Sequence, residues 1–538
     1  MSKALKNVNT HKTSQDTAVL GKNQVKNNAG GYVFRVTDEQ RLQRFLIIGT
    51  DGGTFYASEK RLTDENTQFL VSLIERNEDL VAKETIAISK AGRAKQNSPA
   101  IFAAAALAQF GENKEQAREV FNAVVRTGTH LFEYISYVKN LGGFGRAKRK
   151  TIASWYTGKS EDALAYQLVK YRQRSGWTHG DVLRQVHPQG LDKSLASFAL
   201  GRGVSKDAPA MLHAFEDAQK AKNTADVVAV LKDNPRLPWE VVPTQFHKDL
   251  NVWKTLFENG SLSGTALLRN ITRLARLDAF KDLSFAVEVA DKIKADVSTA
   301  RIHPISYLVS VVTHKDGQMV RSSGYYNFSR APRNRDWTPS EVILDALDDA
   351  FYASFETVEP SGNPFYLGVD VSGSMGMPAV GIDLSCAQVA GAMAMVIART
   401  ERASIIRGFA GPRSGGAQVA DLGITSKTQL PEAMRAVQRH NFGTTDASLI
   451  MQDALDQGYK VHTFATITDN ETWAGGIHPF QALKKYRRET GIDARLVSLA
   501  CSASDFTIAD PSDAGMLDIA GFDASAPRIV SDFAAGRL

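Results

Sequence analysis

A short apolar segment that runs directly into a carboxylate and two hydroxyls constrains the fold of this chain most strongly. Residues 364–375 read PFYLGVDVSGSM, and four of the five residues in 365–369 are apolar. Such a run is typical of a buried strand in a parallel sheet. Asp370, Ser372 and Ser374 follow at the carboxyl end of that strand, which is where open α/β sheets bind ligands. All three side chains offer hard oxygen donors, the kind that Mg²⁺ prefers.

Two later segments fit the same edge of a sheet. Thr445 lies in the turn Gly-Thr-Thr-Asp at 443–446, and Asp469 follows the predicted strand 461–468. The combined pattern resembles the metal-ion-dependent adhesion site of von Willebrand factor A domains. The resemblance implies that a divalent cation, expected to be Mg²⁺, is bound by Asp370, Ser372, Ser374 and Thr445, with Asp469 acting through water. That family's usual turn is Gly-Gly-Thr-Asp, so Thr444 departs from it; the simpler alternative is a strand followed by a polar turn.

Length and composition set the broad class of protein. A chain of 538 residues is too long for one hydrophobic core, and its hydrophobic content of 43% is ordinary for globular proteins. No apolar run approaches the roughly 18–20 residues that span a bilayer, and the N-terminus lacks a signal-peptide pattern. The two cysteines, Cys386 and Cys501, are too few for a disulfide framework. We therefore expect a cytoplasmic protein without membrane segments.

Positive charge is concentrated in the first part of the chain. The net charge is +6, and residues 361–538 hold 15 Lys and Arg against 18 Asp and Glu, which is −3. The preceding residues therefore carry +9. This imbalance favours a polyanionic partner for the N-terminal part.

The pattern along the chain predicts two domains after a polar arm. Residues 1–30 lack hydrophobic periodicity, and we expect a flexible, mildly basic arm. Residues 38–294 show apolar spacing of three and four with regular turn signals, which favours an α-solenoid of helical pairs over an irregular helical bundle. The turn cluster at 359–364 predicts a boundary between a helical domain at 31–360 and a second domain at 361–538.

The second domain alternates predicted strands and helices, which indicates a doubly wound parallel sheet. The predicted strands are 365–369, 404–410, 461–468, 495–501 and 516–520. The predicted helices are 384–400, 429–439, 447–457, 479–490 and 527–536.

A basic stretch lies between residues 139 and 187, with ten Lys and Arg against three acids. Lys170 and Arg174 are four residues apart on a predicted helix that Ser160 would cap, so they would share one face. Arg184 and His187 are three apart on the next short helix, capped by Thr178. Such side chains can hold phosphates and bases of RNA. A solvated basic face is the equally weighted alternative.

The chain resembles the Ro autoantigen family, the TROVE-domain ring proteins, including bacterial Ro-like members. The resemblance covers nearly the whole chain beyond residue 30. The matching stretches are GGYVF at 30–34, RLQRFLIIGTDGG at 41–53, VKYRQRSGWTHGDVLRQVH at 169–187, LPWEVV at 237–242, ALLRN at 266–270, RIHP at 301–304, residues 357–375 around the metal loop, and TDNETW at 468–473.

This resemblance implies a monomeric ring of HEAT-like helical repeats closed by a von Willebrand factor A domain. Its outer face would bind small structured Y-type RNA, and its hole would take single-stranded 3′ ends of misfolded RNA in RNA quality control. An exoribonuclease such as polynucleotide phosphorylase would be a partner. By position, Lys170, Arg174 and His187 match the RNA-binding motif of the family. Arg172, His179 and Arg184 lie beside them in the sequence.

Two other function classes remain to be weighed. One is a metal-dependent, adhesion-type protein-binding module with incidental RNA affinity. The other is an enzyme such as a nuclease, but the sequence holds no H-E-x-x-H, P-loop, G-x-S-x-G or C-x-x-C motif. A metal site richer in hydroxyls than in carboxylates is also poorly suited to two-metal phosphoryl chemistry. We therefore expect a non-catalytic RNA-binding scaffold.

Overall fold

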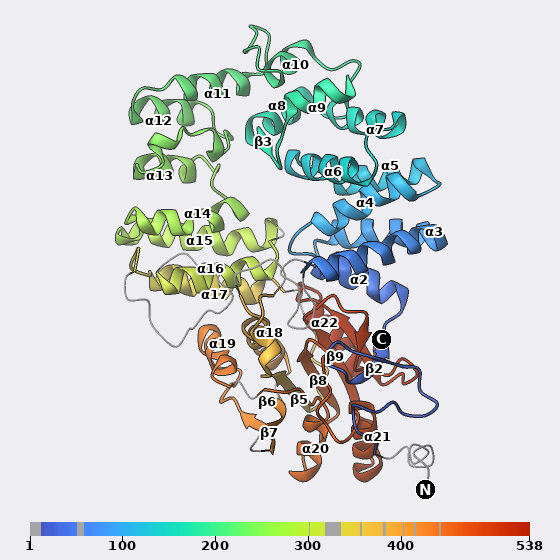
Figure 1. Cartoon of the computed structure of the whole chain (residues 1–538). Helices are drawn as coiled ribbons and strands as arrows, with labels where there is room; N and C mark the ends of the chain where they lie inside the picture. The colour runs from blue at the N-terminus through green and yellow to red at the C-terminus, as the bar shows by residue number, and fades with distance from the viewer. Residues whose placement is uncertain are drawn as a thin grey trace.

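The structure is a computed structural model that describes residues 12–50, 59–300, 302–317, 335–355, 358–379, 384–401, 403–413, 416–440 and 443–538. A helical domain winds through the upper part of the molecule, and a domain built on a β-sheet lies beneath it (Figure 1). Within the described residues, no helix combines the length and apolar composition that crossing a bilayer requires.

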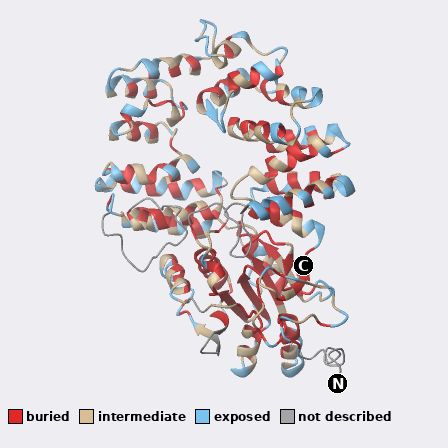
Figure 2. Ribbon diagram, viewed as in Figure 1, coloured by how far each residue is buried: buried red, intermediate tan, exposed pale blue. Residues whose placement is uncertain are grey.

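The helical domain follows the predicted solenoid. Its α-helices are α2 (Asp38–Ile48), α3 (Glu59–Ala91), α4 (Ser98–Phe110), α5 (Lys114–Val124), α6 (Gly128–Leu141), α7 (Arg146–Thr157), α8 (Glu161–Lys170), α9 (His179–Val186), α10 (Lys193–Ala199), α11 (Ala210–Lys220), α12 (Thr224–Asp233), α13 (Leu250–Glu258), α14 (Gly264–Arg276), α15 (Leu283–Thr299), α16 (Pro304–Asp316) and α17 (Glu341–Ala353). Many begin at a residue whose side chain accepts a hydrogen bond from the first turn, as Thr37, Asn113 and Ser160 do. Their apolar faces are buried against neighbouring helices (Figure 2).

The segment between α3 and α4 contacts the start of α16, so the helical domain closes on itself as a ring (Figure 1). His303, which precedes α16, donates from Nε2 to the carbonyl oxygen of Arg93 at 3.2 Å. Lys95 donates from Nζ to Ser306 Oγ at 2.7 Å. Burial, together with the nearby positive charge of Arg269, lowers the pKa of Lys95 to about 8. These contacts join residues more than 200 positions apart in the sequence.

The second domain contains a six-stranded sheet in the order β11-β9-β8-β5-β6-β7. The strands are β5 (Phe365–Asp370), β6 (Ser404–Arg413), β7 (Gly416–Asp421), β8 (Thr463–Thr468), β9 (Arg495–Ala500) and β11 (Met516–Ala520). All neighbouring pairs are parallel except β6 and β7, which are antiparallel. The predicted doubly wound sheet is therefore confirmed, and β7 is an edge strand that the sequence pattern did not indicate.

Helices cover both faces of this sheet (Figure 1). They are α18 (Cys386–Thr400), α19 (Leu430–Gln438), α20 (Leu449–Asp456), α21 (Pro479–Thr490) and α22 (Ala526–Ala535). All residues of β5 and β8 are buried, as expected for central strands (Figure 2). Gly368 allows α20 to approach β5 closely, because a Cβ atom there would lie 2.6 Å from Ile450 Cγ2.

Residues 12–35 form an ordered strap against the second domain, so the prediction of a flexible arm is wrong for residues 12–30. We call these residues the N-terminal strap. Its strands β1 (Gln24–Lys26) and β2 (Tyr32–Arg35) form a small sheet with β10 (Phe506–Thr507). Gln15 donates from Nε2 to Asp446 Oδ1 at 2.7 Å, and Asn27 donates from Nδ2 to the carbonyl oxygen of Thr472 at 2.8 Å. These contacts with distant residues order the strap, and the sequence pattern missed it because such contacts produce no local hydrophobic periodicity. Residues 1–11, the rest of the predicted arm, lie outside the described residues.

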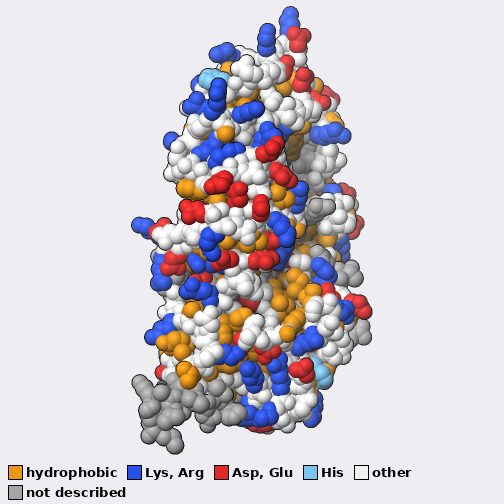
Figure 3. All heavy atoms as spheres, turned by 90° about the vertical axis from the view of Figure 1, so that its right-hand side faces the viewer, with side chains coloured by type: hydrophobic (Ala, Val, Ile, Leu, Met, Phe, Trp, Pro, Cys, Tyr) orange, Lys and Arg blue, Asp and Glu red, His pale blue; other side chains and the backbone are white. Residues whose placement is uncertain are grey.

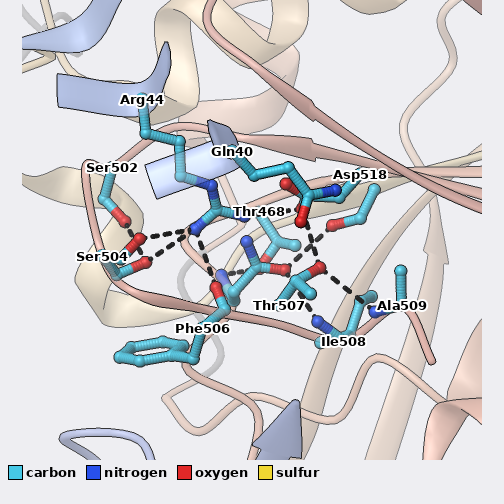
Figure 4. A network of polar contacts seen from close by, with 12 residues as sticks. Gln40, Arg44, Thr468, Ser502, Ser504, Phe506, Thr507, Ile508, Ala509 and Asp518 are labelled. Atoms are coloured by element: carbon cyan, nitrogen blue, oxygen red, sulfur yellow. Dashed lines mark hydrogen bonds and ion pairs between the residues drawn. The ribbon is translucent and has the colours of Figure 1, made fainter. Parts of the chain in front are cut away.

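A buried arginine joins the ring to the sheet. Arg44 of α2 is fully buried, and its Nη2 lies 2.6 Å from Asp518 Oδ1 in β11. Its Nη1 donates to the carbonyl oxygens of Ser504 and Phe506 at 2.8 and 2.7 Å (Figure 4). Asp518 Oδ1 also accepts from Thr507 Oγ1 at 2.7 Å. The guanidinium thus satisfies a buried carboxylate and two backbone carbonyls of the other domain.

We expect Arg44→Met to lower the free energy of unfolding by about 3–5 kcal/mol, because the Asp518 carboxylate would stay buried without its partner. Urea unfolding of the full chain measures this loss. The double variant Arg44→Met/Asp518→Asn removes both charges, and we expect it to recover part of the loss. If the double variant loses as much unfolding free energy as Arg44→Met and Asp518→Asn lose in sum, the two residues are not coupled.

Candidate nucleic-acid interface and metal-site loops

The structure gathers the predicted metal ligands at the carboxyl ends of β5 and β8. Asp370 Oδ2 accepts a hydrogen bond from Thr468 Oγ1 at 2.6 Å, and Asp370 Oδ1 accepts from the backbone N–H of Ser372 at 2.9 Å. The hydroxyls of Ser372 and Ser374 lie 3.1 Å apart. The first loop therefore points one carboxylate and two hydroxyls toward the same edge.

The other two predicted ligands arrive on neighbouring loops. The N–H of Gly373 donates to the carbonyl oxygen of Gly443 at 3.1 Å, which holds the loop of Thr445 against that of Ser374. Asp469 receives a side-chain hydrogen bond from Ser374. All five predicted ligands are buried: Asp370, Ser372, Ser374, Thr445 and Asp469.

The chemistry of these residues fits a hard divalent cation. Burial and the nearby charge of Asp469 raise the pKa of Asp370 well above its usual value, because two carboxylates in one buried site destabilise each other's ionised forms. The hydroxyl of Thr445 is buried and has no hydrogen-bond partner within the described structure, so its oxygen is available. Among the described residues, no three His, Cys, Asp or Glu side chains gather, so the site would rest on two carboxylates and three hydroxyls.

The basic residues near 170 lie on a hairpin and a helix end. Ser160 caps α8 as predicted, but α8 ends at Lys170, and Arg174 lies in the two-residue strand β3 (Gln173–Arg174) paired with β4 (Trp177–Thr178). The prediction that Lys170 and Arg174 share one helix face is therefore wrong. Ser175 and Gly176 form the connecting turn with φ values of 52° and 75°. Two positive φ values suit a tight hairpin turn, and the Ser-Gly dipeptide was the sequence signal for it.

Lys170 is held between two tyrosines. Its Nζ donates to Tyr166 Oη at 2.9 Å and lies 5.2 and 5.6 Å from the ring centroids of Tyr166 and Tyr171. Burial opposes the charged form, but the hydrogen bond to Tyr166 and the two tyrosines raise the pKa of Lys170. The lysine thus stays charged and pre-positioned. The sequence reasoning missed Tyr166, although its spacing of four residues from Lys170 on one helix was a usable signal.

Four further basic side chains are exposed around Lys170. Arg174 extends from the hairpin, and the guanidinium of Arg172 lies 4.9 Å from the centroid of the Phe215 ring. Arg184 of α9 is 3.2 Å from Asp181, which also forms the capping box with Thr178. His187 ends α9 in a left-handed conformation with φ of 45°, and it is exposed.

His179 belongs to the core of the ring, so its predicted place on the RNA-binding surface is not supported. It is only 3% exposed, its Nδ1 lies 2.9 Å from Tyr156 Oη, and its ring stacks on Trp155 at 6.0 Å. Burial lowers the pKa of His179 to about 4, which keeps it neutral at physiological pH. Its position at the start of α9 turns the side chain inward, whereas His187 at the other end faces solvent.

Comparison with known proteins identifies the family. A model of the TROVE domain matches residues 25–235 and 231–363, and a model of the Ro60 vWA domain matches residues 364–534. A Deinococcus radiodurans protein named RNA-binding protein RO60 is 35% identical over 541 residues, covering 97% of each chain. A Caenorhabditis elegans protein of the same name is 31% identical over 603 residues, covering 96% of this chain and 90% of that one.

The fold agrees with a solved structure of the same group. The crystal structure of the Deinococcus radiodurans RO (RSR) protein matches with a TM-score of 0.67 and 33% sequence identity, over 93% of this chain and all of that one. The chain therefore belongs to the Ro60 family, in which a TROVE domain is joined to a vWA domain.

Proposed function

We propose that this protein is a non-catalytic scaffold that binds small structured Y-type RNA through Lys170, Arg172, Arg174, Arg184 and His187. The observation that carries the proposal is the arrangement of these cations on one hairpin and the adjoining α9, beside a lysine that two tyrosines hold in its charged form. Relatives that share nearly the full length of this chain are named RNA-binding proteins.

The chemistry of the surface matches the backbone of folded RNA. Arginine guanidinium groups pair with phosphate oxygens through two parallel hydrogen bonds, and exposed histidine can stack on or hydrogen-bond an unpaired base. Because the deep groove of an RNA helix is closed to side chains, a protein recognises such RNA mainly by shape, phosphates and single-stranded loops. A surface of exposed cations with one exposed imidazole suits this kind of ligand.

The closed ring supports a second part of the proposal. Single-stranded 3′ ends of misfolded RNA would enter the hole of the ring, whose size would admit one strand and exclude a duplex. The contacts of Arg93 and Lys95 with the last part of the solenoid support a ring that stays closed. In RNA quality control in the cytoplasm, a monomeric ring of this kind would present such ends to an exoribonuclease such as polynucleotide phosphorylase.

A second candidate function rests on the metal-site loops. We infer that Asp370, Ser372, Ser374 and Thr445 hold a divalent cation, expected to be Mg²⁺, with Asp469 acting through water. Two observations support this inference. The Thr445 hydroxyl is buried without a hydrogen-bond partner in the described structure, and burial together with the charge of Asp469 raises the pKa of Asp370. The bound cation would supply an electrophilic site for a carboxylate of a protein partner. Because the site lies on the other domain, this function is separable from RNA binding.

The variant Lys170→Gln/Arg174→Gln tests the RNA site. We expect weaker binding of a small structured RNA, and a slope of log K against log salt that is smaller by about two, because about one counterion is released for each phosphate contact. Fluorescence anisotropy over a salt series measures both. Lys232→Gln/Lys248→Gln removes two exposed charges from other parts of the ring and is the matched control. Equal slopes in the two variants would remove Lys170 and Arg174 from the interface.

The variant Asp370→Asn tests the metal site. Mg²⁺ at about 100 times its Kd should stabilise the wild type by about 2.7 kcal/mol and the variant not at all, because binding to the native state alone shifts unfolding by mass action. Thermal unfolding with EDTA or with Mg²⁺ measures this. RNA binding by the variant should equal that of the wild type. A variant that stays folded but no longer binds RNA would show that the two sites are not independent.

A further inference from the structure

The N-terminal strap contacts two loops of the proposed cation site, which we call the Thr445 loop (443–446) and the Asp469 loop (469–473). In Figure 1 the strap is the dark blue segment along the right-hand side of the vWA domain. Figure 3 looks onto that side, where charged side chains lie at the surface in the lower half. The contact with the loops is made on the inner side of the strap, because Gln15 is fully buried.

The side-chain amide of Gln15 joins the two loops to each other. Its Nε2 donates to Asp446 Oδ1 of the Thr445 loop at 2.7 Å. Its Oε1 accepts from Thr472 Oγ1 of the Asp469 loop at 2.6 Å. One side chain of the strap therefore bridges two loops that each carry one of the predicted ligands of the cation.

The backbone of Gln15 is also held in place. Its N–H donates to the carbonyl oxygen of Gly475 at 2.9 Å, and its carbonyl oxygen accepts from the N–H of Tyr32 at 2.7 Å. Glycine at 475 permits this close approach, because a Cβ atom there would overlap Gln15 Nε2 and Asp446 Oδ1. With its backbone and its amide both bonded in the interior, Gln15 fixes how the two loops lie relative to each other.

A second part of the strap holds the Asp469 loop. The side chain of Asn28 donates from Nδ2 to Glu471 Oε1 at 2.8 Å, and the N–H of Ala29 donates to Glu471 Oε2 at 3.1 Å. The N–H of Glu471 in turn donates to Asp469 Oδ1 at 3.1 Å. The strap thus also fixes the residue whose backbone orients the Asp469 carboxylate.

We propose that Gln15 is a positioning residue for the cation site, and that docking of the strap and binding of a divalent cation strengthen each other. Replacing a residue that orients metal ligands typically weakens metal binding by about 10–100-fold. Because coupling between two binding events is reciprocal, a strap that favours cation binding is itself held more tightly when the cation is bound. The inference rests on the proposed cation site and adds the strap to it.

The variant Gln15→Met tests the positioning role, because methionine keeps the length of the side chain and removes its hydrogen bonds to both loops. We expect the Kd for Mg²⁺ to rise about tenfold, measured on the full chain from the increase in Tm with Mg²⁺ concentration. Gln24→Met is the matched control, since Gln24 is the other glutamine of the strap and its side-chain hydrogen bonds within the described residues reach neither loop. We expect the wild-type Kd for this control.

Hydrogen exchange of the wild-type protein is a second measurement, which needs no variant that folds. The N–H groups of Gln15 and Tyr32 report on the strap, because both are bonded only while it is docked. We expect saturating Mg²⁺ to slow their exchange by about tenfold relative to EDTA. In Asp370→Asn, which lacks a proposed ligand, Mg²⁺ should leave their exchange unchanged.

The outcomes separate this inference from the proposed cation site. Equal Kd values for Gln15→Met and Gln24→Met, whether unchanged or raised, would overturn the positioning role of Gln15; a lower Tm in EDTA alone is what a purely structural role would produce. Exchange of the strap that ignores Mg²⁺, in a wild type that binds Mg²⁺, would overturn the coupling and leave the cation site intact. A wild type whose Tm does not respond to Mg²⁺ would overturn both.

Discussion

The molecule depends on one buried charge that crosses between its domains. The guanidinium of Arg44 is fully buried. Burying a charge costs much free energy unless the charge is paired and its N–H groups have hydrogen-bond acceptors. Asp518 supplies the opposite charge, and the carbonyl oxygens of Ser504 and Phe506 supply further acceptors. Because these acceptors belong to the vWA domain, the contacts of Arg44 hold the first helix of the ring against that domain.

The same loops reach the proposed cation site. Ser502 Oγ lies 3.3 Å from the carbonyl oxygen of Asp469 and 3.2 Å from Ser504 Oγ, so its single hydroxyl proton has an acceptor on either side, next to the Arg44 contacts. Asn470 takes a left-handed backbone conformation with φ of 66°, and its Oδ1 accepts from Ser498 Oγ at 2.8 Å. At the carboxyl edge of the sheet, the loops of the proposed cation site are therefore joined by hydrogen bonds to the loop on which the ring rests.

The charged side chains named above lie in separate regions of the molecule. The cations around Lys170 lie on the ring. The proposed metal site is built from buried carboxylates and hydroxyls of the vWA domain.

The sequence by itself determined the helical character of the first domain, the main strand and helix order of the second, and the loops of the proposed metal site. Helical and strand periodicities are local, and side chains that follow parallel strands must meet at one edge, so Asp370 and Asp469 were predictable neighbours. The resemblance carried by 169–187 pointed to the basic residues themselves. The tertiary structure decided which of these residues face solvent: it turned His179 into the core and placed Arg174 on a hairpin. It also ordered the strap and paired Arg44 with Asp518, since these contacts join residues more than 400 positions apart and leave no trace in any local pattern.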